Sequence, residues 1–309
     1  MNNLNDIFNI EQFNNLEFIA KQVVEGFITG LHKSPFHGFS VEFAEHRIYN
    51  TGESTRHIDW KLYARSEKLF VKRYEEETNL RCQIVVDTSS SMLFPFNEVG
   101  KPNKLVFSIY CAAALINLLR KQRDAAGITT FSDKIELHTD AKLSATHSKM
   151  LYAELEKTLN FGNSKSVVNK KTTASQLLHQ IAENIHKRSM VIIFSDLLET
   201  ENQDDIFSAL QHLRYNKHEV ILFHVIDSVH ERDFQFQNRP YKFIDLESNE
   251  EVRFNPNDVK DIYTTKMAEF LNKIKIRTGQ FGIDLITADI NSSFRNVLLP
   301  YLIKRSKLY

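Results

Sequence analysis

The chain has 309 residues, and its 39 Lys and Arg side chains are balanced by 39 Asp and Glu side chains, for a formal net charge of zero. This balance argues against a protein that binds nucleic acid through a general excess of positive charge. With 42% hydrophobic and 25% charged residues, the composition is that of a folded protein rather than a disordered one. The length fits one large or two modest domains.

The two cysteines and the lack of targeting signals bear on the compartment. Cys82 and Cys111 lie in apolar surroundings and fit no metal-binding spacing, so both are expected to be small buried hydrophobic residues. The first residues show no basic and apolar leader pattern. The longest uncharged stretch, 105–119, is shorter than the roughly 20 residues that span a bilayer. These features predict a cytoplasmic protein without a transmembrane segment.

Residues 1–80 are predicted to form an N-terminal helix followed by a small β-rich arm. Apolar residues recur at helical spacing over 11–31, which predicts an amphipathic helix. Short alternating runs at 41–43 and 69–74 then flank a polar, turn-rich stretch. We treat this segment as the first domain.

Residues 81–309 alternate between apolar strands and amphipathic helices. Strands are expected over 82–86, 126–131, 134–138, 190–194, 219–227 and 282–286, and helices over 104–120, 149–159, 174–186, 206–215, 259–278 and 294–303. Continuous apolar strands joined by helices predict an α/β, Rossmann-like domain, with a mostly parallel sheet covered by helices on both faces. Two short strands, near 242–244 and 251–254, predict a β insertion around 228–258.

Oxygen-bearing side chains follow two of the predicted strands. Asp87, Ser89 and Ser91 follow the first strand as Asp-x-Ser-x-Ser, and Asp196 follows the strand 190–194. Thr172 directly precedes the helix 174–186. Functional groups collect at the carboxyl ends of parallel strands, and hard oxygen ligands suit Mg²⁺ or Mn²⁺. The sequence therefore predicts a metal site from these five residues, with Thr173 as an alternative to Thr172.

This pattern resembles the metal-ion-dependent adhesion site of von Willebrand factor A domains. The preceding segment is similar to a bacterial family of unknown function, DUF58, whose members join such an arm to a von Willebrand A-like domain. Members of this family are commonly encoded beside MoxR-type AAA+ ATPases. The residues of the likeness in the arm are Gly38, Phe39, Arg47, Tyr49, Gly52, Glu53, Arg56, Ile58, Asp59, Trp60, Ala64, Arg65, Leu69, Val71, Tyr74, Glu75 and Glu77. The likeness runs from Gly38 to the end of the chain.

The resemblance implies a role for each predicted ligand. Ser89, Ser91 and Thr172 would bind the ion directly, Asp87 and Asp196 would hold metal-bound waters, and a partner protein would supply a carboxylate as the sixth ligand. The chain departs from the family pattern in two places. Lys170 and Lys171 stand where glycines usually precede the threonine, and Leu197 stands where a glycine usually follows the second aspartate.

Three alternatives remain open from the residues alone. The Asp-x-Ser-x-Ser segment would also make a metal-free loop, because Asp and Ser cap turns and helices well. The arm could be a structural ion-pair network or a surface for partner docking, since Arg and Trp are common hot spots. The arm residues concerned are Arg47, Arg56, Asp59, Trp60 and Arg65. The lysines of 165–171 could be merely solvated, or could steer an acidic partner to the metal.

We therefore expect a non-enzymatic interaction module that binds an acidic group of a partner through Mg²⁺ or Mn²⁺. The resemblance implies that the partner is a MoxR-type AAA+ ATPase, which the protein would serve as adaptor or co-chaperone, or a client protein of that ATPase. The alternative is a metal-dependent phosphoester hydrolase. No phosphate-binding loop motif is present, and nothing in the sequence favours binding to nucleic acid.

Overall fold

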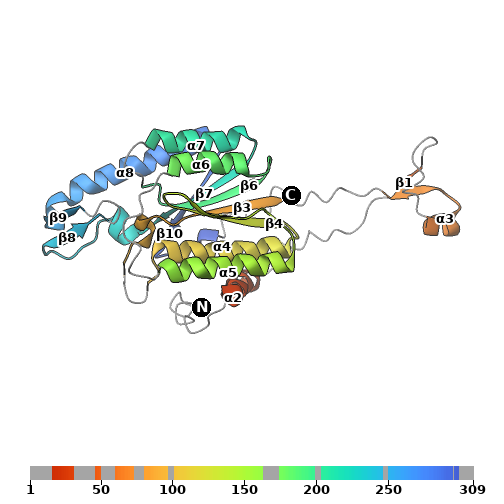
Figure 1. Ribbon diagram of the computed structural model, residues 1–309, viewed down its shortest axis with the longest axis horizontal. Coiled ribbons are helices and arrows are strands. Elements are labelled where there is room, and N and C mark those ends of the chain that lie inside the picture. The colour runs from red at the N-terminus through yellow and green to blue at the C-terminus, as the bar shows by residue number, and fades with distance from the viewer. Residues whose placement is uncertain are drawn as a thin grey trace. The chain divides into compact units, whose positions relative to one another are not determined.

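A computed structural model describes residues 16–30, 46–49, 60–72, 80–96, 101–162, 174–198, 203–245, 250–294 and 296–298 (Figure 1). The chain divides into two compact units. The larger one, here called the core unit, comprises Met1–Lys33 and Leu80–Tyr309, and the smaller one, the arm, comprises Ser34–Asn79. The sequence analysis had grouped the N-terminal helix with the arm, and the structure assigns this helix to the core unit instead.

A six-stranded sheet of order β10-β7-β6-β3-β4-β5 forms the centre of the core unit. Its strands are β3 (Arg81–Asp87), β4 (Ala125–Phe131), β5 (Ile135–His138), β6 (Met190–Ser195), β7 (Glu219–Ile226) and β10 (Asp284–Asp289). All neighbours are parallel except β5, which pairs antiparallel with β4 at the edge. The predicted α/β architecture with a mostly parallel sheet is confirmed, and the strands lie within a few residues of their predicted positions.

Helices cover both faces of this sheet (Figure 1). One face carries α4 (Lys104–Lys121) and α5 (Ala145–Gly162), and the other carries α6 (Ala174–Asn184), α7 (Gln203–Tyr215) and α8 (Pro256–Gln280). Apolar residues of β3, β6 and β7 pack with those of α6 and α7 in one buried cluster. The central strands β3 and β6 are almost wholly buried, which explains why they appear as continuous apolar runs in the sequence. Both cysteines are free and buried, as predicted.

The N-terminal helix, α2 (Leu16–Gly30), packs against α4. Its buried residues, Leu16, Ile19, Ala20, Val23 and Val24, recur at helical spacing and form one apolar stripe. Glu17 on this helix pairs with Arg120 of α4 at 3.2 Å. Burial of the stripe on α4 explains why this helix belongs to the core unit.

The arm contains two short strands and one short helix within its described residues. β1 (His46–Ile48) pairs antiparallel with β2 (Phe70–Lys72), and α3 (Trp60–Ser66) lies between them in sequence. The sequence analysis did not predict α3. Its motif Trp-Lys-Leu-Tyr-Ala-Arg-Ser contains good helix formers but is too short for apolar periodicity to identify it.

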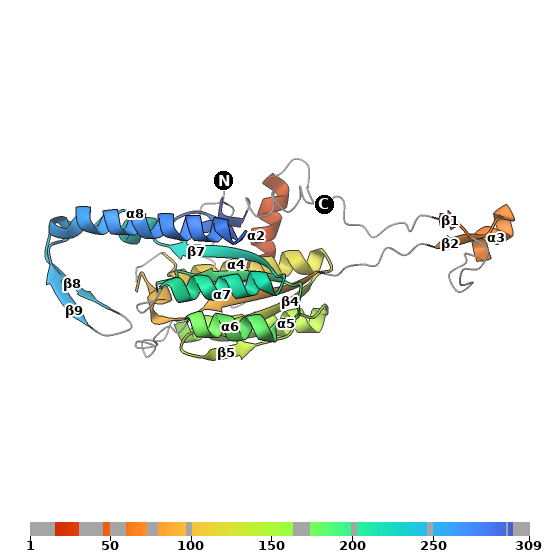
Figure 2. The same cartoon turned by 90° about the horizontal axis from the view of Figure 1, so that it is seen from above.

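The predicted β insertion forms a hairpin of β8 (Tyr241–Ile244) and β9 (Glu251–Phe254). It follows a π-helical turn, η4 (Ser228–Arg232), and leads directly into α8 (Figure 2). Aromatic side chains of Phe234, Phe236 and Phe243 contact one another, and Phe234 also contacts Tyr263 of α8. These ring contacts fasten the insertion to the first half of α8.

Candidate functional site

The two predicted aspartates meet at one edge of the sheet, because β3 and β6 are parallel neighbours that end at the same level. Val86 of β3 stands opposite Phe194 of β6, so Asp87 and Ser195 come next at the two strand ends. The Ser195 hydroxyl donates to Asp87 Oδ2 at 2.7 Å, and the Ser89 backbone N–H donates to Asp87 Oδ1 at 2.9 Å. Asp196 follows directly, and both carboxyl groups are buried. The carboxylates therefore converge as the sequence predicted.

The hydroxyls of Ser89 and Ser91 complete the described part of the predicted site. Their Oγ atoms lie 3.0 Å apart and share a hydrogen bond, with Ser89 just before the short 3-10 helix η3 (Ser90–Leu93) and Ser91 within it. Two neighbouring ligands on an octahedral Mg²⁺, each about 2.1 Å from the ion, stand roughly 3 Å apart. The spacing of the two hydroxyls fits adjacent positions on such an ion.

A buried lysine, which the sequence analysis did not single out, lies against these carboxylates. Lys104 begins α4 and its side chain is fully buried, with its ammonium group 2.7 Å from Asp196 Oδ2 and 2.6 Å from Glu231 Oε1. A lysine in the first turn of a helix opposes the helix dipole, so it is expected to need acidic partners. This conflict was the one signal in the sequence that could have pointed to Lys104.

Glu231 is held in place by the turn η4, which follows β7. Its second oxygen, Oε2, accepts the backbone N–H of Asp227 at 2.8 Å. Asp227 in turn accepts hydrogen bonds from the His230 ring at 2.7 Å and from the Asn291 amide at 2.7 Å. The position of Glu231 therefore depends on a polar network that joins the ends of β7 and β10.

The charges of the site do not balance within the described residues that form it. Three buried or nearly buried carboxyl groups, those of Asp87, Asp196 and Glu231, share the single ammonium of Lys104. Burial, together with the neighbouring Asp196 carboxylate, raises the pKa of Asp87 to about 7. Burial also acts to raise the pKa of Asp196, but Lys104 outweighs it and the pKa is lowered. With all three carboxyls ionised, a divalent cation would neutralise the remaining charge of the group.

A buried histidine lies behind Asp196. His224 Nε2 donates to the backbone carbonyl of Asp196 at 3.0 Å, which assigns the proton of the neutral ring to Nε2. Burial lowers the pKa of His224 to about 4, so the ring is neutral at physiological pH. The ring thus fixes the backbone of Asp196 without adding charge to the site.

Leu197 stands where the resemblance to the adhesion site would place a glycine. Its backbone has a φ of 54°, in the left-handed region where a side chain is strained. The leucine side chain is nevertheless buried in the cluster beneath α6 and α7. The strained turn directs the Leu198 N–H at Asp196 Oδ1, at 3.1 Å.

Several predicted residues fall outside the described part of the chain. These are Thr172, Thr173, the lysines of 165–171, Arg56 and Asp59. Arg47 lies in β1, where its side chain is not described, whereas Trp60 and Arg65 are exposed on α3. The Trp60 ring contacts Tyr63 edge to face at 6.2 Å between centroids. The structure thus brings together four of the five predicted metal ligands, and the fifth stays a prediction.

The described residues contain no group of three or more His, Cys, Asp or Glu side chains placed to hold a metal ion. The candidate site has a different donor set, with the two carboxylates of Asp87 and Asp196 and the two hydroxyls of Ser89 and Ser91. The hydroxyl spacing and the excess negative charge fit a small divalent cation. The four residues would hold it together with water and any further ligand.

Comparison with protein families gives one match over most of the chain. The model of the protein family of unknown function DUF58 matches residues 45–270. The chain belongs to the DUF58 family. Curated relatives of this DUF58 protein include uncharacterized proteins of Mycobacterium bovis and of two Mycobacterium tuberculosis strains. Each is 33% identical over 79 residues, which is 26% of this chain and 25% of the relative's own length.

Three solved structures show a distant likeness to the chain. An aerotolerance-related membrane protein of Bacteroides fragilis aligns over 71% of this chain and 96% of its own, at 14% identity and a TM-score of 0.44. The protein BatB of Bacteroides thetaiotaomicron aligns over 74% and 100%, at 12% identity and a TM-score of 0.40. A membrane-spanning protein of Vibrio fischeri aligns over 72% and 98%, at 15% identity and a TM-score of 0.22.

The predicted cytoplasmic location is corrected by these comparisons, because similar solved structures include proteins named as membrane proteins. The prediction had rested on the lack of a leader pattern and of a long apolar run, and neither observation places a protein in a compartment. In the part of the chain that the structure describes, no helix has the length and apolarity needed to cross a membrane.

Proposed function

We propose that this DUF58 protein is a non-enzymatic interaction module with a von Willebrand A-like fold, which captures an acidic group of a partner through Mg²⁺ or Mn²⁺. The observation that carries the proposal is the pairing of two adjacent hydroxyls, Ser89 and Ser91, with a group of three buried or nearly buried carboxyl groups that share one ammonium. When bound, the ion would supply an open position for a carboxylate oxygen from outside the chain.

The residues of this site would divide the work between them. Ser89 and Ser91 would offer their hydroxyl oxygens to the ion, and Asp87 and Asp196 would supply negative charge next to it. Asp87 is oriented by Ser195 and by the Ser89 backbone, and Asp196 by Lys104 and Leu198. Thr172, which precedes α6 by two residues in the sequence, would add a third hydroxyl.

The proposed partner is a MoxR-type AAA+ ATPase, or a client of it, in keeping with the resemblance described above. The test uses the purified full chain as bait for a purified MoxR-type ATPase from the same organism. We expect capture in Mg²⁺, loss of capture in EDTA, and loss in Asp87→Ala. The matched control Asp205→Asn, which alters an exposed acid of α7, should bind like the wild type. Capture that persists in EDTA would contradict metal bridging.

A metal-dependent phosphoester hydrolase is the second candidate, and one observation favours it. A general base works best when its pKa lies near the working pH, and the pKa of Asp87 is raised to about 7. The assay is release of nitrophenol from bis(p-nitrophenyl) phosphate by the full chain with Mn²⁺. Turnover that Asp87→Asn abolishes and Asp205→Asn retains would support this candidate over the interaction module, whereas no turnover would reject it.

A further inference from the structure

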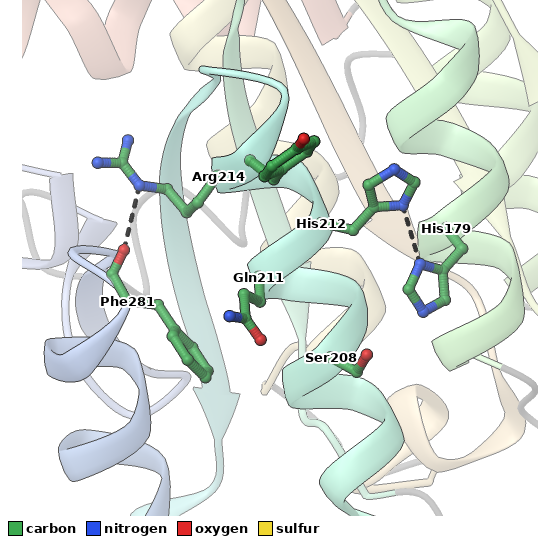
Figure 3. Close-up of a pocket in the computed structure, with 7 residues that line it drawn as sticks. His179, Ser208, Gln211, His212, Arg214 and Phe281 are labelled. Carbon is green, nitrogen blue, oxygen red and sulfur yellow. Dashed lines mark hydrogen bonds between the residues drawn. The ribbon is translucent and has the colours of Figure 1, made fainter.

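A pair of histidines, one from α6 and one from α7, lines part of a shallow hollow whose other lining residues come from α7 and from Phe281 just after α8 (Figure 3). His179 comes from α6 and His212 from α7, and the two ring Nδ1 atoms lie 2.9 Å apart. The ring centroids are 5.1 Å apart and the planes are inclined by 42°. The residues are 33 positions apart in sequence, so no His-x-x-x-His spacing could reveal them.

The two histidines are held on a rigid base. α6 and α7 pack against each other, and both contribute buried leucines to the core cluster. The histidines themselves are only half-buried. The leucines of this base are Leu177, Leu178, Leu210 and Leu213. Because this core fixes the backbone, the fold itself holds the two imidazoles close together before any ligand binds.

We propose that His179 and His212 bind a divalent transition-metal ion, Cu²⁺, Ni²⁺ or Zn²⁺, through their Nδ1 atoms. Imidazole nitrogen is a preferred ligand of these ions. Two nitrogens that bind at right angles, each about 2.0–2.1 Å from the ion, stand roughly 2.9 Å apart. The observed separation of the two nitrogens, 2.9 Å, meets this requirement for the right-angle ligands of square-planar Cu²⁺ or Ni²⁺, whereas tetrahedral Zn²⁺ needs a somewhat wider separation. Both rings must also turn away from the line that joins the two nitrogens, so that their lone pairs converge on one ion.

The proton of the pair has a simple route when the ion binds. In the neutral pair one Nδ1 carries a proton and donates to the other, which accepts through its lone pair. Binding needs both Nδ1 lone pairs, so the donating ring shifts its proton to its own Nε2 through water. The two rings keep the same number of protons, and no oxidant, reductant or other reactant is involved.

The hollow leaves room for the remaining ligands of the ion. Its lining includes Ser208 and Gln211, and Ser208 lies one helical turn before His212 on α7. Figure 3 shows the two imidazoles turned toward each other across the gap between the helices. Water from the open side would complete the coordination sphere. This site differs in donor type from the oxygen site at Asp87, and the two share no residue.

Copper electron paramagnetic resonance tests the proposal on the full chain in excess Mg²⁺. We expect one Cu²⁺ ion with hyperfine coupling to two imidazole nitrogens. His179→Gln and His212→Gln each remove one of the two ligands. Loss of an outer-shell contact weakens metal binding about 10–100-fold, so each variant should bind Cu²⁺ at least that much more weakly. The matched control His186→Gln, which changes an exposed histidine just beyond α6, should bind like the wild type.

A second measurement separates this site from the oxygen site and from loss of folding. Zn²⁺ should raise the thermal unfolding temperature of the wild type and of Asp87→Ala, but not of the double variant His179→Gln/His212→Gln. The double variant should unfold at the wild-type temperature without metal, because both side chains are partly exposed. Copper binding that survives in both single variants, or that falls equally in His186→Gln, would overturn the proposal.

Discussion

Lys104 is the residue on which the charge of the candidate site depends. Its buried ammonium is shared by Asp196 and Glu231, and its burial acts against the charge that these two partners stabilise. Removing one partner of a buried ion pair leaves the other charge without compensation in a medium of low polarity. The lysine is therefore expected to stabilise the fold as well as to arrange the site.

Substitution of this lysine should cost much of the stability of the core unit. For Lys104→Met we expect a loss of about 3–5 kcal/mol in the free energy of unfolding, measured in urea. Lys187→Met, at an exposed lysine after α6, should change it by less than about 0.5 kcal/mol. A loss below about 1 kcal/mol in Lys104→Met would show that the carboxyls adapt by taking up protons.

Two opposing effects act at Leu197: the left-handed backbone is strained, and the buried side chain is stabilising. Their free energies decide whether a glycine would be more or less stable here. A left-handed backbone costs a leucine about 1–2 kcal/mol, whereas loss of a buried leucine side chain costs about 2–5 kcal/mol. Leu197→Gly should therefore destabilise the protein although it introduces the glycine that the resemblance implies. Leu197→Ala keeps the strain and loses most of the side chain, so it should be about 1 kcal/mol less stable than Leu197→Gly. Urea unfolding of both variants gives the order, and the reverse order would contradict the strained geometry.

The buried ring of His224 makes stability depend on pH. Its pKa is about 4 in the folded chain and about 6.5 when unfolded, so between these values the unfolded chain binds more protons. This residue's contribution to stability therefore falls as the pH drops from 6.5 to 4, by about 3 kcal/mol in total. Asp87 acts in the opposite direction, because its raised pKa makes stability fall as the pH rises from about 4 to 7.

The two contributions can be separated with a variant that keeps the hydrogen bond. His224→Gln can still donate to the Asp196 carbonyl but does not titrate. The stability of the wild type minus that of His224→Gln should decrease steadily between pH 6.5 and pH 4 in urea unfolding experiments. A difference that stays constant over this range would show that the ring is not buried in its neutral form.

At the level of elements, β4 depends on a glycine where another segment comes close. A Cβ atom on Gly127 would stand 2.6 Å from the backbone carbonyl of Thr139 and 2.5 Å from the Gln83 side chain. Gly279, in the last turn of α8, has nothing within 4 Å of its Cβ position. Gly127 thus lies in a crowded environment, whereas Gly279 lies in an open one.

Alanine should act with opposite sign at these two positions. Gly127→Ala should lower the free energy of unfolding by about 1–3 kcal/mol, because the backbone of β4 or of 139–141 must shift. Gly279→Ala should raise it by about 0.5–1 kcal/mol, since alanine favours the helix. Thermal unfolding of both variants measures the two changes. Equal destabilisation by the two substitutions would contradict the close approach at Gly127.

The sequence predicted the elements of the core unit well because each of them has a simple apolar pattern. Strands such as β3 and β6 are buried on both faces, and helices such as α4 show long apolar runs between polar ends. The short helix α3 and the turn η4 were missed, since neither is long enough to show a period. Phe294 and 296–298 are helical, and the rest of the predicted closing helix lies outside the described residues.

The sequence predicted the candidate site only in part, because some of its residues are far apart along the chain. Asp87 and Asp196 could be predicted because each directly follows an apolar strand. Lys104 and Glu231 are 127 positions apart, and their contact depends on the turn η4. Their pairing becomes visible only when the ends of β6, β7 and α4 are placed together.

At the level of the whole molecule, the core unit and the arm contain different candidate functional residues. The core unit contains the candidate metal site and the histidine pair, whereas the arm exposes Trp60 and Arg65 on α3. The role of the arm in docking a partner stays a prediction, as does that of Arg47, Arg56 and Asp59. The net charge of zero does not describe the local distribution at the sheet edge, where three carboxyl groups share the ammonium of Lys104.

We propose that this sheet edge binds one divalent cation through Ser89, Ser91 and the neighbouring aspartates. The most direct measurement is a titration of Mn²⁺ into the full chain, with Mg²⁺ as competitor. Binding is followed by the loss of the electron paramagnetic resonance signal of free Mn²⁺. We predict one Mn²⁺ site, from which Mg²⁺ displaces the bound ion. Asp87→Ala and Ser89→Ala should abolish this binding, whereas Asp205→Asn should retain it. Circular dichroism should show that all variants are folded. No Mn²⁺ binding by the wild type, or unchanged binding by both Asp87→Ala and Ser89→Ala, would contradict the claim.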